Sequence, residues 1–352
     1  MTINQSLLQN SPQAVTTNPC RDLIDSGLLI PSNRFLARNG KRIRASMLQL
    51  TFQMAGGRGV PPACLGKAIE WLHAGSLVID DIEDDSHSRR GKPTLHREIG
   101  LSLALNAGNW MYFRAMEHLL DGSLTPEIQH RLLRKMIVTA RRCHEGQTLD
   151  LSARVDKDNP GDFQSVVRAI SRLKTGGLVA MSGSFGATVV GSNKLLRSAL
   201  SRFGMSVGVA LQMRNDLEEL RSLVRDSDKN VELRCDDLRH ARVTWPWAWA
   251  VQLSDSSELR KLIDLLSHSR NSRQAMLDLA AQLACLVGPT GDVAIRSRVE
   301  KPLRLLGEHV VDNSALQQMR SMLTQIIQPG IEPATIPSIN PPSEGNPHVD
   351  ND

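Results

Sequence analysis

A dense acidic cluster, with arginines just beyond it, is the first feature of this chain that could do chemistry. Asp80, Asp81 and Asp84 follow an apolar run that is typical of the end of a buried helix, and Arg89 and Arg90 come shortly after. Residues four apart share a helix face, so Asp80 and Asp84 would repel each other by about 0.2–0.5 kcal/mol. The helix dipole also opposes negative charge at a C-terminus. Two penalties at one place indicate that a cation binds here.

The residue types indicate which cation this is. Oxygen ligands in a cluster, without Cys or His at a suitable spacing, favour a hard ion such as Mg²⁺. Because Mg²⁺ completes its shell with water and phosphate oxygens, Arg89 and Arg90 would bind phosphate beside it. The alternative is a solvated acidic helix end, which the two electrostatic penalties disfavour. The residues alone therefore predict a Mg²⁺–diphosphate site.

The composition is that of a soluble globular protein, with 41% hydrophobic and 22% charged residues and a net charge of +5. This small basic excess, without interleaved aromatic residues, argues against nucleic-acid binding and suits an anionic small substrate. Five cysteines without Cys-x-x-Cys spacing predict reduced thiols in a cytoplasmic protein. No signal peptide is recognisable, and no run reaches the roughly 18 apolar residues of an integral membrane segment.

The elements that must position the acidic cluster are predicted to be helices. Apolar residues recur at helical spacing, as in Leu65, Ile69 and Leu72, and no strict alternation indicates a sheet. We predict a single all-α domain over residues 18–327. Residues 1–17 are polar and residues 328–352 are rich in proline, so both are predicted to be disordered tails.

Several segments together resemble one family. The acidic cluster, read as Asp80-Asp81-x-x-Asp84 followed by Arg89-Arg90-Gly91-x-Pro93, is similar to the first aspartate-rich motif of the trans-isoprenyl diphosphate synthases, or polyprenyl synthases. The other segments that resemble family motifs are Gly40-Lys41-Arg42-Ile43-Arg44, His144-Glu145-Gly146-Gln147-x-x-Asp150, Lys174-Thr175-Gly176-Gly177, Gln212-Met213-Arg214-Asn215-Asp216-Leu217-Glu218-Glu219, and Lys229 with Asp236-Asp237-Leu238 and Arg242-x-Thr244-x-Pro246. Each would be weak alone, but their collinear order is specific.

The resemblance implies the isoprenoid synthase fold, a single large helical bundle around a central apolar cavity, and a homodimer. The implied activity is Mg²⁺-dependent prenyl transfer from an allylic diphosphate to isopentenyl diphosphate. Loss of diphosphate builds negative charge, so metal ions and basic residues would lower the barrier, and no protein nucleophile is needed. The implied residues are Asp80, Asp81, Asp84, Asn215, Asp216 and Glu219 for two or three Mg²⁺ ions; Lys41, Arg44, His73 and Arg90 for isopentenyl diphosphate; Arg89, Lys174 and Lys229 for the allylic diphosphate, with Arg242 as a further substrate-binding residue; and Lys174, Thr175 and Gln212 as catalytic residues.

The second acidic motif departs from the family pattern. Asn215 stands where the family usually has Asp, so this position can ligate a metal but brings no charge; Glu219, one turn later, offers a compensating carboxylate. Arg242 stands where the family has Lys.

Three functions remain open: an active synthase, a terpene cyclase-like relative that ionises a prenyl diphosphate alone, and a non-catalytic regulatory subunit. The complete set of isopentenyl diphosphate residues favours the synthase.

Product length would depend on the floor of the apolar tunnel below the first motif. Ser76 is small, so no aromatic residue blocks the tunnel there as in farnesyl diphosphate synthases. Tyr112, Phe113 and His144 resemble a floor one layer deeper, as in eukaryote-type geranylgeranyl diphosphate synthases, although plain core packing would also explain the two aromatic residues. We therefore expect geranylgeranyl diphosphate as the product, with farnesyl diphosphate as the allylic substrate. Alanine at both positions 112 and 113 is expected to lengthen the product.

Overall fold

The computed structural model describes residues 18–327, except 39, 41, 121, 226–235, 309 and 311. The two predicted tails, 1–17 and 328–352, lie outside the described residues. So do two of the predicted substrate-binding residues, Lys41 and Lys229.

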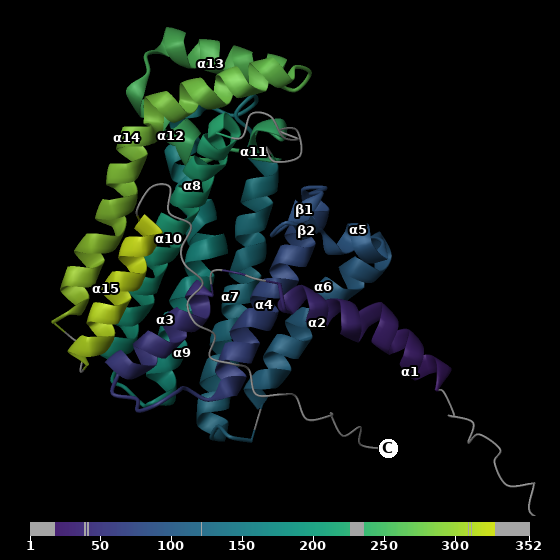
Figure 1. The fold of residues 1–352 in the computed structure, drawn as a ribbon. Coiled ribbons are helices and arrows are strands. Elements are labelled where there is room, and N and C mark those ends of the chain that lie inside the picture. Colours follow the sequence, from purple (N-terminus) through teal and green to yellow (C-terminus); the bar gives the residue numbers. More distant parts are fainter. Residues whose placement is uncertain are drawn as a thin grey trace, which may run out of the picture.

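Almost all of the described chain is helical, which confirms the predicted all-α class (Figure 1). In chain order the elements, with η for 3₁₀ and π segments, are α1 (Pro19–Ile24), η1 (Asp25–Leu29), α2 (Ile30–Leu36), α3 (Ile43–Met54), α4 (Ala63–Glu83), β1 (Ser88–Arg89), β2 (Lys92–Pro93), α5 (Leu95–Ile99), α6 (Leu101–Glu117), η2 (His118–Leu120), α7 (Pro126–Ser152), η3 (Pro160–Asp162), α8 (Phe163–Ser171), η4 (Arg172–Gly176), α9 (Gly177–Val189), α10 (Lys194–Arg225), α11 (Asp236–Arg239), α12 (Trp245–Leu253), α13 (Ser256–Ser269), α14 (Arg273–Leu306) and α15 (Asn313–Ile327).

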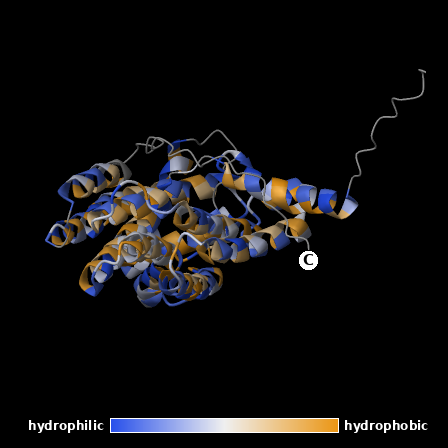
Figure 2. Ribbon diagram, turned by 90° about the horizontal axis from the view of Figure 1, so that it is seen from below, coloured by the Kyte–Doolittle hydropathy of each residue, from blue (hydrophilic) through white to orange (hydrophobic). Residues whose placement is uncertain are grey.

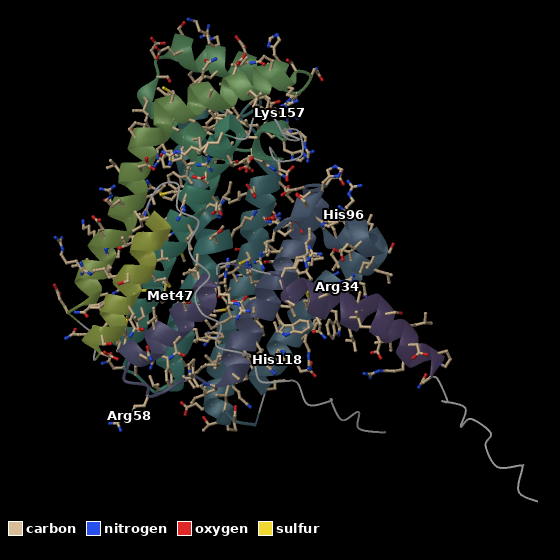
Figure 3. All side chains as sticks on the ribbon, in the orientation of Figure 1. Arg34, Met47, Arg58, His96, His118 and Lys157 are labelled. Carbon is tan, nitrogen blue, oxygen red and sulfur yellow. The ribbon has the colours of Figure 1, made fainter. Side chains whose placement is uncertain are left out.

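Helix α10 is the central element of the bundle, and it packs against α9, η4, α12 and α14. One apolar cluster follows α10 and α14, with Phe203 and Leu283 among its buried residues. A second cluster joins α4 to α6, and there Leu65 and Ile69 are fully buried as their spacing predicted. Most helices carry both hydrophobic and hydrophilic residues along their length (Figure 2). Lys157, after α7, and Arg58, between α3 and α4, mark opposite ends of the bundle (Figure 3).

A small hairpin interrupts the helices directly after the acidic cluster, where no strand was predicted. Ser88 pairs with Pro93 and Arg89 with Lys92. Between them Arg90 and Gly91 both have positive φ, 56° and 73°, as a two-residue type I′ turn requires. Strands of two residues are too short to produce a periodic sequence pattern. The hairpin turns the chain so that Arg89 lies back across the end of α4.

Close approaches of backbone fix two helix pairs. A Cβ added at Gly208 of α10 would lie 2.6 Å from the Cα of Gly176, so α10 and η4 touch through their backbones. A Cβ added at Gly75 of α4 would lie 2.8 Å from the carbonyl oxygen of Gly108 on α6. Glycine is needed at these positions because any side chain would push the helices apart.

The loop after α7 is held by an ion-pair cluster whose effect on stability can be measured. Asp156 accepts hydrogen bonds from Arg154 Nε at 2.9 Å and from Arg270 Nη2 at 2.6 Å. The bonds from Arg154, and then from Arg270, outweigh the effect of burial and hold the pKa of Asp156 well below its usual value.

Because the folded-state pKa of Asp156 is depressed, its stabilisation is present above the unfolded pKa of about 3.9 and is lost as the pH falls. Asp156→Asn is expected to lower the free energy of unfolding by about 1 kcal/mol at pH 7. The difference from wild type should shrink below about pH 4. Urea unfolding across this pH range measures the effect, with Asp264→Asn on the exposed face of α13 as the control. A pH-independent difference would contradict the assignment.

Candidate active site

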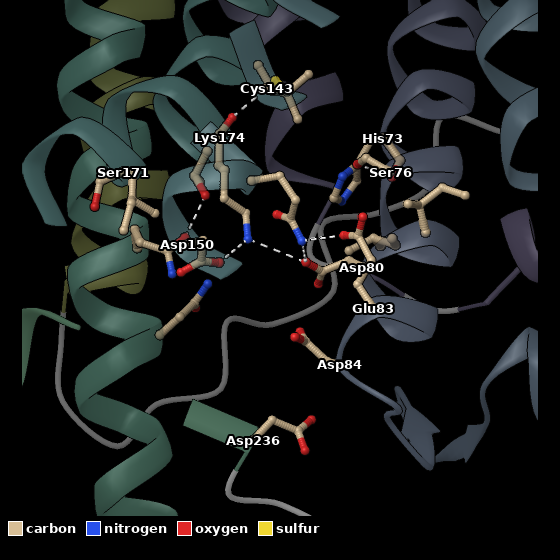
Figure 4. Close-up of a pocket in the computed structure, with 18 of the residues that line it drawn as sticks. His73, Ser76, Asp80, Glu83, Asp84, Cys143, Asp150, Ser171, Lys174 and Asp236 are labelled. Carbon is tan, nitrogen blue, oxygen red and sulfur yellow. Dashed lines mark hydrogen bonds and ion pairs between the residues drawn. The ribbon is translucent and has the colours of Figure 1, made fainter. Parts of the chain in front are cut away.

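The predicted site residues gather around one cavity of about 340 Å³, where α4, α7, η4 and α10 meet. Figure 4 shows acidic residues of α4 facing Asp150 and Lys174 across this space. The predicted residues that line the cavity are Arg44, His73, Ser76, Asp80, Asp84, Arg89, Tyr112, His144, Lys174, Thr175, Gln212, Asn215, Asp216 and Glu219. Residues from separate motifs are therefore brought together by the fold.

Asp80 lies at the centre of a charged network that spans the cavity. Its Oδ1 lies 3.4 Å from Lys174 Nζ and accepts a hydrogen bond from Gln147 Nε2 at 3.1 Å. Lys174 also bonds to Asp150 on α7. Burial alone would raise the pKa of Asp80, but Lys174 and then Arg89 hold it below its usual value. Burial alone would lower the pKa of Lys174, but Asp80 and Asp150 raise it, so both Asp80 and Lys174 are charged at neutral pH.

Asp81 differs from its predicted place as a metal ligand, because it points away from the cavity. Its side chain is 1% exposed, and its Oδ1 accepts a hydrogen bond from Arg89 Nε at 2.7 Å. Burial raises the pKa of Asp81 to about 6 despite Arg89. The one-residue step from Asp80 to Asp81 explains the difference, because consecutive helical residues point about 100° apart. Asp80 and Asp84 share the cavity side of α4, while Asp81 faces the hairpin. In this structure Asp81 fixes Arg89 beside Asp80.

Arg242, predicted to bind substrate, also lies outside the cavity lining. Its Nη2 donates to Asp84 Oδ1 at 2.7 Å, and its Nη1 donates to the carbonyl oxygen of Asp150 at 2.6 Å. Both distances are those of charge-assisted hydrogen bonds. An arginine fork can hold two acceptors at once where a lysine offers a single charge. Arg242 thus ties the end of α4 to the end of α7 and orients Asp84.

A hydrogen-bonded chain links η4 to α10 and α12. Thr175 Oγ1 donates to Gln212 Oε1 at 2.6 Å, and Gln212 Nε2 donates to Asp216 Oδ1 at 2.8 Å. The other Asp216 oxygen accepts from the backbone N–H of Trp245 at 3.0 Å. Lys174 and Thr175 lie in η4, a π-helical turn, which is a feature often found at functional sites. Thr175 and Gln212, predicted to line the reaction centre, are therefore positioned together.

The second acidic group is strongly buried and self-repelling. Burial, and then further carboxylates, raise the pKa of Asp216 to about 7 and that of Glu219 to about 8. Asp237, at the start of α11, also lines the cavity, and burial and Glu219 raise its pKa well above the usual value. Asn215 is exposed, and its side chain makes no hydrogen bond to the other described residues. Carboxylates crowded in this way favour a bound cation.

The donor set fits Mg²⁺. Asp80 and Asp84 could supply oxygen ligands on one side of the cavity, and Asp150, Asp216 and Glu219 could supply them on the other. Within the described ranges, no three His, Cys, Asp or Glu side chains are already close enough to hold an ion. The carboxylate oxygens instead form ion pairs with basic residues: Asp80 with Lys174, and Asp84 with Arg242. Binding of an ion would require these side chains to rearrange.

The predicted isopentenyl diphosphate residues that the structure describes are Arg44, His73 and Arg90. Arg44 of α3 and His73 of α4 line the cavity, whereas Arg90 lies behind Gly40 and donates from Nη1 to the carbonyl oxygen of Arg38 at 3.1 Å. Burial, followed by Arg44 and Arg90, lowers the pKa of His73 well below 6.5, so His73 is neutral. Its Nδ1 is buried without a partner among the described residues. These groups could hold an anionic substrate group.

The apolar end of the cavity lies below Ser76. Tyr112 and His144 meet edge to face there, with ring centroids 5.6 Å apart and an interplanar angle of 87°. The predicted place of Phe113 in the floor is wrong for this chain, because its side chain is 70% exposed and does not line the cavity. Consecutive helical residues point about 100° apart, so Tyr112 and Phe113 cannot both face the same cavity.

Some functional candidates were not among the predicted site residues. The missed acidic and amide residues that line the cavity are Glu83, Gln147, Asp150, Asp236 and Asp237. Gln147 and Asp150 are one turn apart on α7, and Asp236 accepts a hydrogen bond from Ser86 Oγ at 2.7 Å. All five lie within the sequence segments that resemble family motifs, although Glu83 stands at an unspecified position of its motif. Those segments therefore carried the missing signal.

Comparisons with known proteins show the family of this chain. A family model described as Polyprenyl synthetase matches residues 27–283, and the chain belongs to this family. It is 33% identical over 202 residues to a geranylgeranyl pyrophosphate synthase of Rhodocybe pseudopiperita, a match that covers 56% of each chain. It is 29% identical over 254 residues to a geranylgeranyl diphosphate synthase of Sulfolobus acidocaldarius, covering 71% of this chain and 74% of that one. The chain thus spans little more than half the length of the Rhodocybe relative.

Solved structures show the same fold. A crystal structure of a geranylgeranyl pyrophosphate synthase matches with a TM-score of 0.73 at 20% identity, over 86% of this chain and 91% of that one. A geranylgeranyl pyrophosphate synthetase from Pyrococcus horikoshii Ot3 matches with a TM-score of 0.70 at 24% identity, over 88% and 96%. The predicted isoprenoid synthase fold is confirmed. No helix within the described residues is long and apolar enough to cross a membrane.

Proposed function

We propose that this chain is a Mg²⁺-dependent trans-prenyltransferase that condenses isopentenyl diphosphate with an allylic diphosphate. The observation that carries the proposal is that acidic residues face each other across one cavity. Lys174 contacts Asp80 and Asp150 there, and Arg89 contacts Asp80. The lining of the same cavity also includes the apolar residues Leu72, Leu77 and Leu178. This arrangement suits a ligand with a charged head and an apolar tail. The names of the similar proteins support the same activity.

The reaction begins when the carbon–oxygen bond of the allylic diphosphate breaks and its electron pair leaves with the diphosphate. Lys174 and Arg89 stabilise the developing negative charge, and bound Mg²⁺ would supply further charge neutralisation. The double bond of isopentenyl diphosphate then attacks the allylic carbon and forms the new carbon–carbon bond. The resulting cation loses a proton to the released diphosphate, and a new double bond forms. Arg44 and the neutral His73 hold the diphosphate of isopentenyl diphosphate, while the oxygens of Thr175 and Gln212 face the allylic cation.

Further parts of the proposal concern assembly and location. We place the catalytic domain at residues 18–327 and the protein in the cytoplasm, which suits cysteines such as Cys64 and Cys143 that are not in disulfide bonds. We also propose a homodimer, because α6 exposes Leu101, Leu103 and Phe113 to solvent, with exposed fractions of 57%, 47% and 70%. Exposed apolar side chains at this density are typical of an interaction surface.

The activity is tested by incubating the purified protein with Mg²⁺ and prenyl diphosphates. The synthase elongates farnesyl diphosphate only when isopentenyl diphosphate is present, and chelation of Mg²⁺ stops the reaction. A cyclase-like enzyme would instead release hydrocarbon from a prenyl diphosphate alone. A non-catalytic subunit would do neither.

The product length is proposed to be twenty carbons, with farnesyl diphosphate as the preferred allylic substrate. Geranylfarnesyl diphosphate synthases are also among the similar proteins. The length of the product is therefore proposed to depend on the residues that close the apolar end of the cavity. Tyr112→Ala removes a half-buried ring that meets His144 and is expected to extend the main product by at least one five-carbon unit. Chromatography of the dephosphorylated products measures this. Phe113→Ala is the control, and an unchanged product from Tyr112→Ala would remove the floor assignment.

A further inference from the structure

A second hollow lies at the opposite end of the bundle from the acidic site. It has a volume of about 420 Å³ and is formed by the first turns of α7, the last turns of α9 and the first turns of α10. Helix α7 spans the distance between the two sites, since Arg131 and Lys135 line the hollow and Gln147 and Asp150 line the acidic cavity. Figure 1 shows the beginning of α7 at the lower end of the molecule. The hollow is therefore separate from the proposed active site.

Five cationic side chains and no acidic one line this hollow: Arg131, Lys135, Lys194, Arg197 and Arg202. Arginines elsewhere commonly meet a carboxylate, as Arg221 meets Asp292 at 2.7 Å. Here Arg131 pairs with the exposed Glu127 at 2.7 Å. Within the described part of the chain, the other four have no carboxylate partner. Such a concentration of unneutralised charge is unfavourable in the free protein and attracts an anion.

The individual side chains are arranged as donors. Arg202 Nη1 donates to Ser198 Oγ at 2.6 Å, which leaves the Ser198 hydroxyl hydrogen free to donate into the hollow. Arg197 donates to the carbonyl oxygen of Ser192 beside the start of α10. Lys135 is half-buried, and burial followed by Arg142 lowers its pKa.

The N-terminus of α10 adds to this field. The 32-residue helix begins at Lys194, directly at the hollow, and its positive end favours a bound anion. Guanidinium groups and hydroxyl groups donate hydrogen bonds, and the oxygens of a phosphate group accept them with well-matched geometry. We propose that this hollow is a second, non-catalytic site that binds the phosphate group of a ligand. The ligand is either a free di- or polyphosphate or the headgroup of an anionic phospholipid.

The test compares two double variants that remove the same charge. Lys135→Gln with Arg202→Gln removes two cations from the hollow, and Arg260→Gln with Lys261→Gln removes two exposed cations from α13. Inorganic diphosphate, with metal chelated, is one probe, and its bound amount per chain is measured by equilibrium dialysis. Vesicles of phosphatidylcholine with about 20% phosphatidic acid are the other, measured by co-sedimentation at low salt, because such contacts are screened by salt.

The hollow variant is expected to bind at least one of the two probes about tenfold more weakly, while the α13 variant matches wild type. Loss confined to dialysis identifies a free phosphate ligand, and loss confined to vesicles identifies a lipid headgroup. The melting temperature of the hollow variant should not fall, since the substitutions relieve repulsion. Lys194→Gln, an exposed position, serves as the second variant if the double variant does not fold. Equal binding of both probes by the hollow variants and the α13 variant would overturn the proposal.

Discussion

Asp80→Asn is expected to lower kcat for prenyl transfer by about a thousandfold. Asp80 contacts Lys174, Arg89 and Gln147, so one carboxylate organises the basic groups that meet the diphosphate. It is also the α4 carboxylate whose pKa is held low, and so it is fully charged at neutral pH. Asparagine keeps the shape of the side chain but removes the charge that would hold Mg²⁺. Steady-state kinetics at saturating Mg²⁺ measures the effect.

The matched control for this change is Asp85→Asn. Asp85 lies in the same acidic run, but its side chain is 71% exposed and pairs with Arg97 rather than lining the cavity. Its φ of 50° is a conformation that asparagine accepts readily, so the fold should tolerate the change. Near-wild-type activity is expected from this variant. If Asp80→Asn retained more than about a tenth of the wild-type kcat, the role assigned to Asp80 would be wrong.

Lys174→Gln is expected to lower kcat by about 10²–10³. The ammonium group lies between Asp80 and Asp150, and no other lysine within the described residues lines the cavity. Without it, two partly buried carboxylates repel each other and the leaving diphosphate loses a positive partner. Kinetics with farnesyl diphosphate, with Lys157→Gln outside the cavity as the control, measures the loss. A change in KM alone would show that Lys174 binds the substrate without stabilising the transition state.

Much of the site could be predicted because helical spacing is regular. The four-residue step from Asp80 to Asp84 correctly placed both carboxylates on one face, and the ordered motifs anticipated that Lys174, Thr175 and Gln212 would meet. The apolar positions Leu65 and Ile69 were likewise predicted to be buried, as they are.

Other features depended on tertiary contacts that no local pattern encodes. The sequence could not show that Asp81 turns from the cavity to bind Arg89, because that contact depends on the hairpin. Arg242 meets Asp84 only after the chain returns across the bundle. The π turn that holds Lys174 touches α10 at Gly208, and no local sequence pattern predicted that contact. Phe113 was misplaced because a pair of adjacent aromatic residues was treated as one surface of the tunnel.

The central claim is that this chain couples loss of diphosphate to formation of a new carbon–carbon bond. The most direct test is to incubate the protein with Mg²⁺, farnesyl diphosphate and labelled isopentenyl diphosphate, and to measure released diphosphate and labelled product together. The account predicts equal amounts of both, with a twenty-carbon alcohol after phosphatase treatment and no release without isopentenyl diphosphate. Diphosphate release that does not require isopentenyl diphosphate, or no release at all, would contradict it.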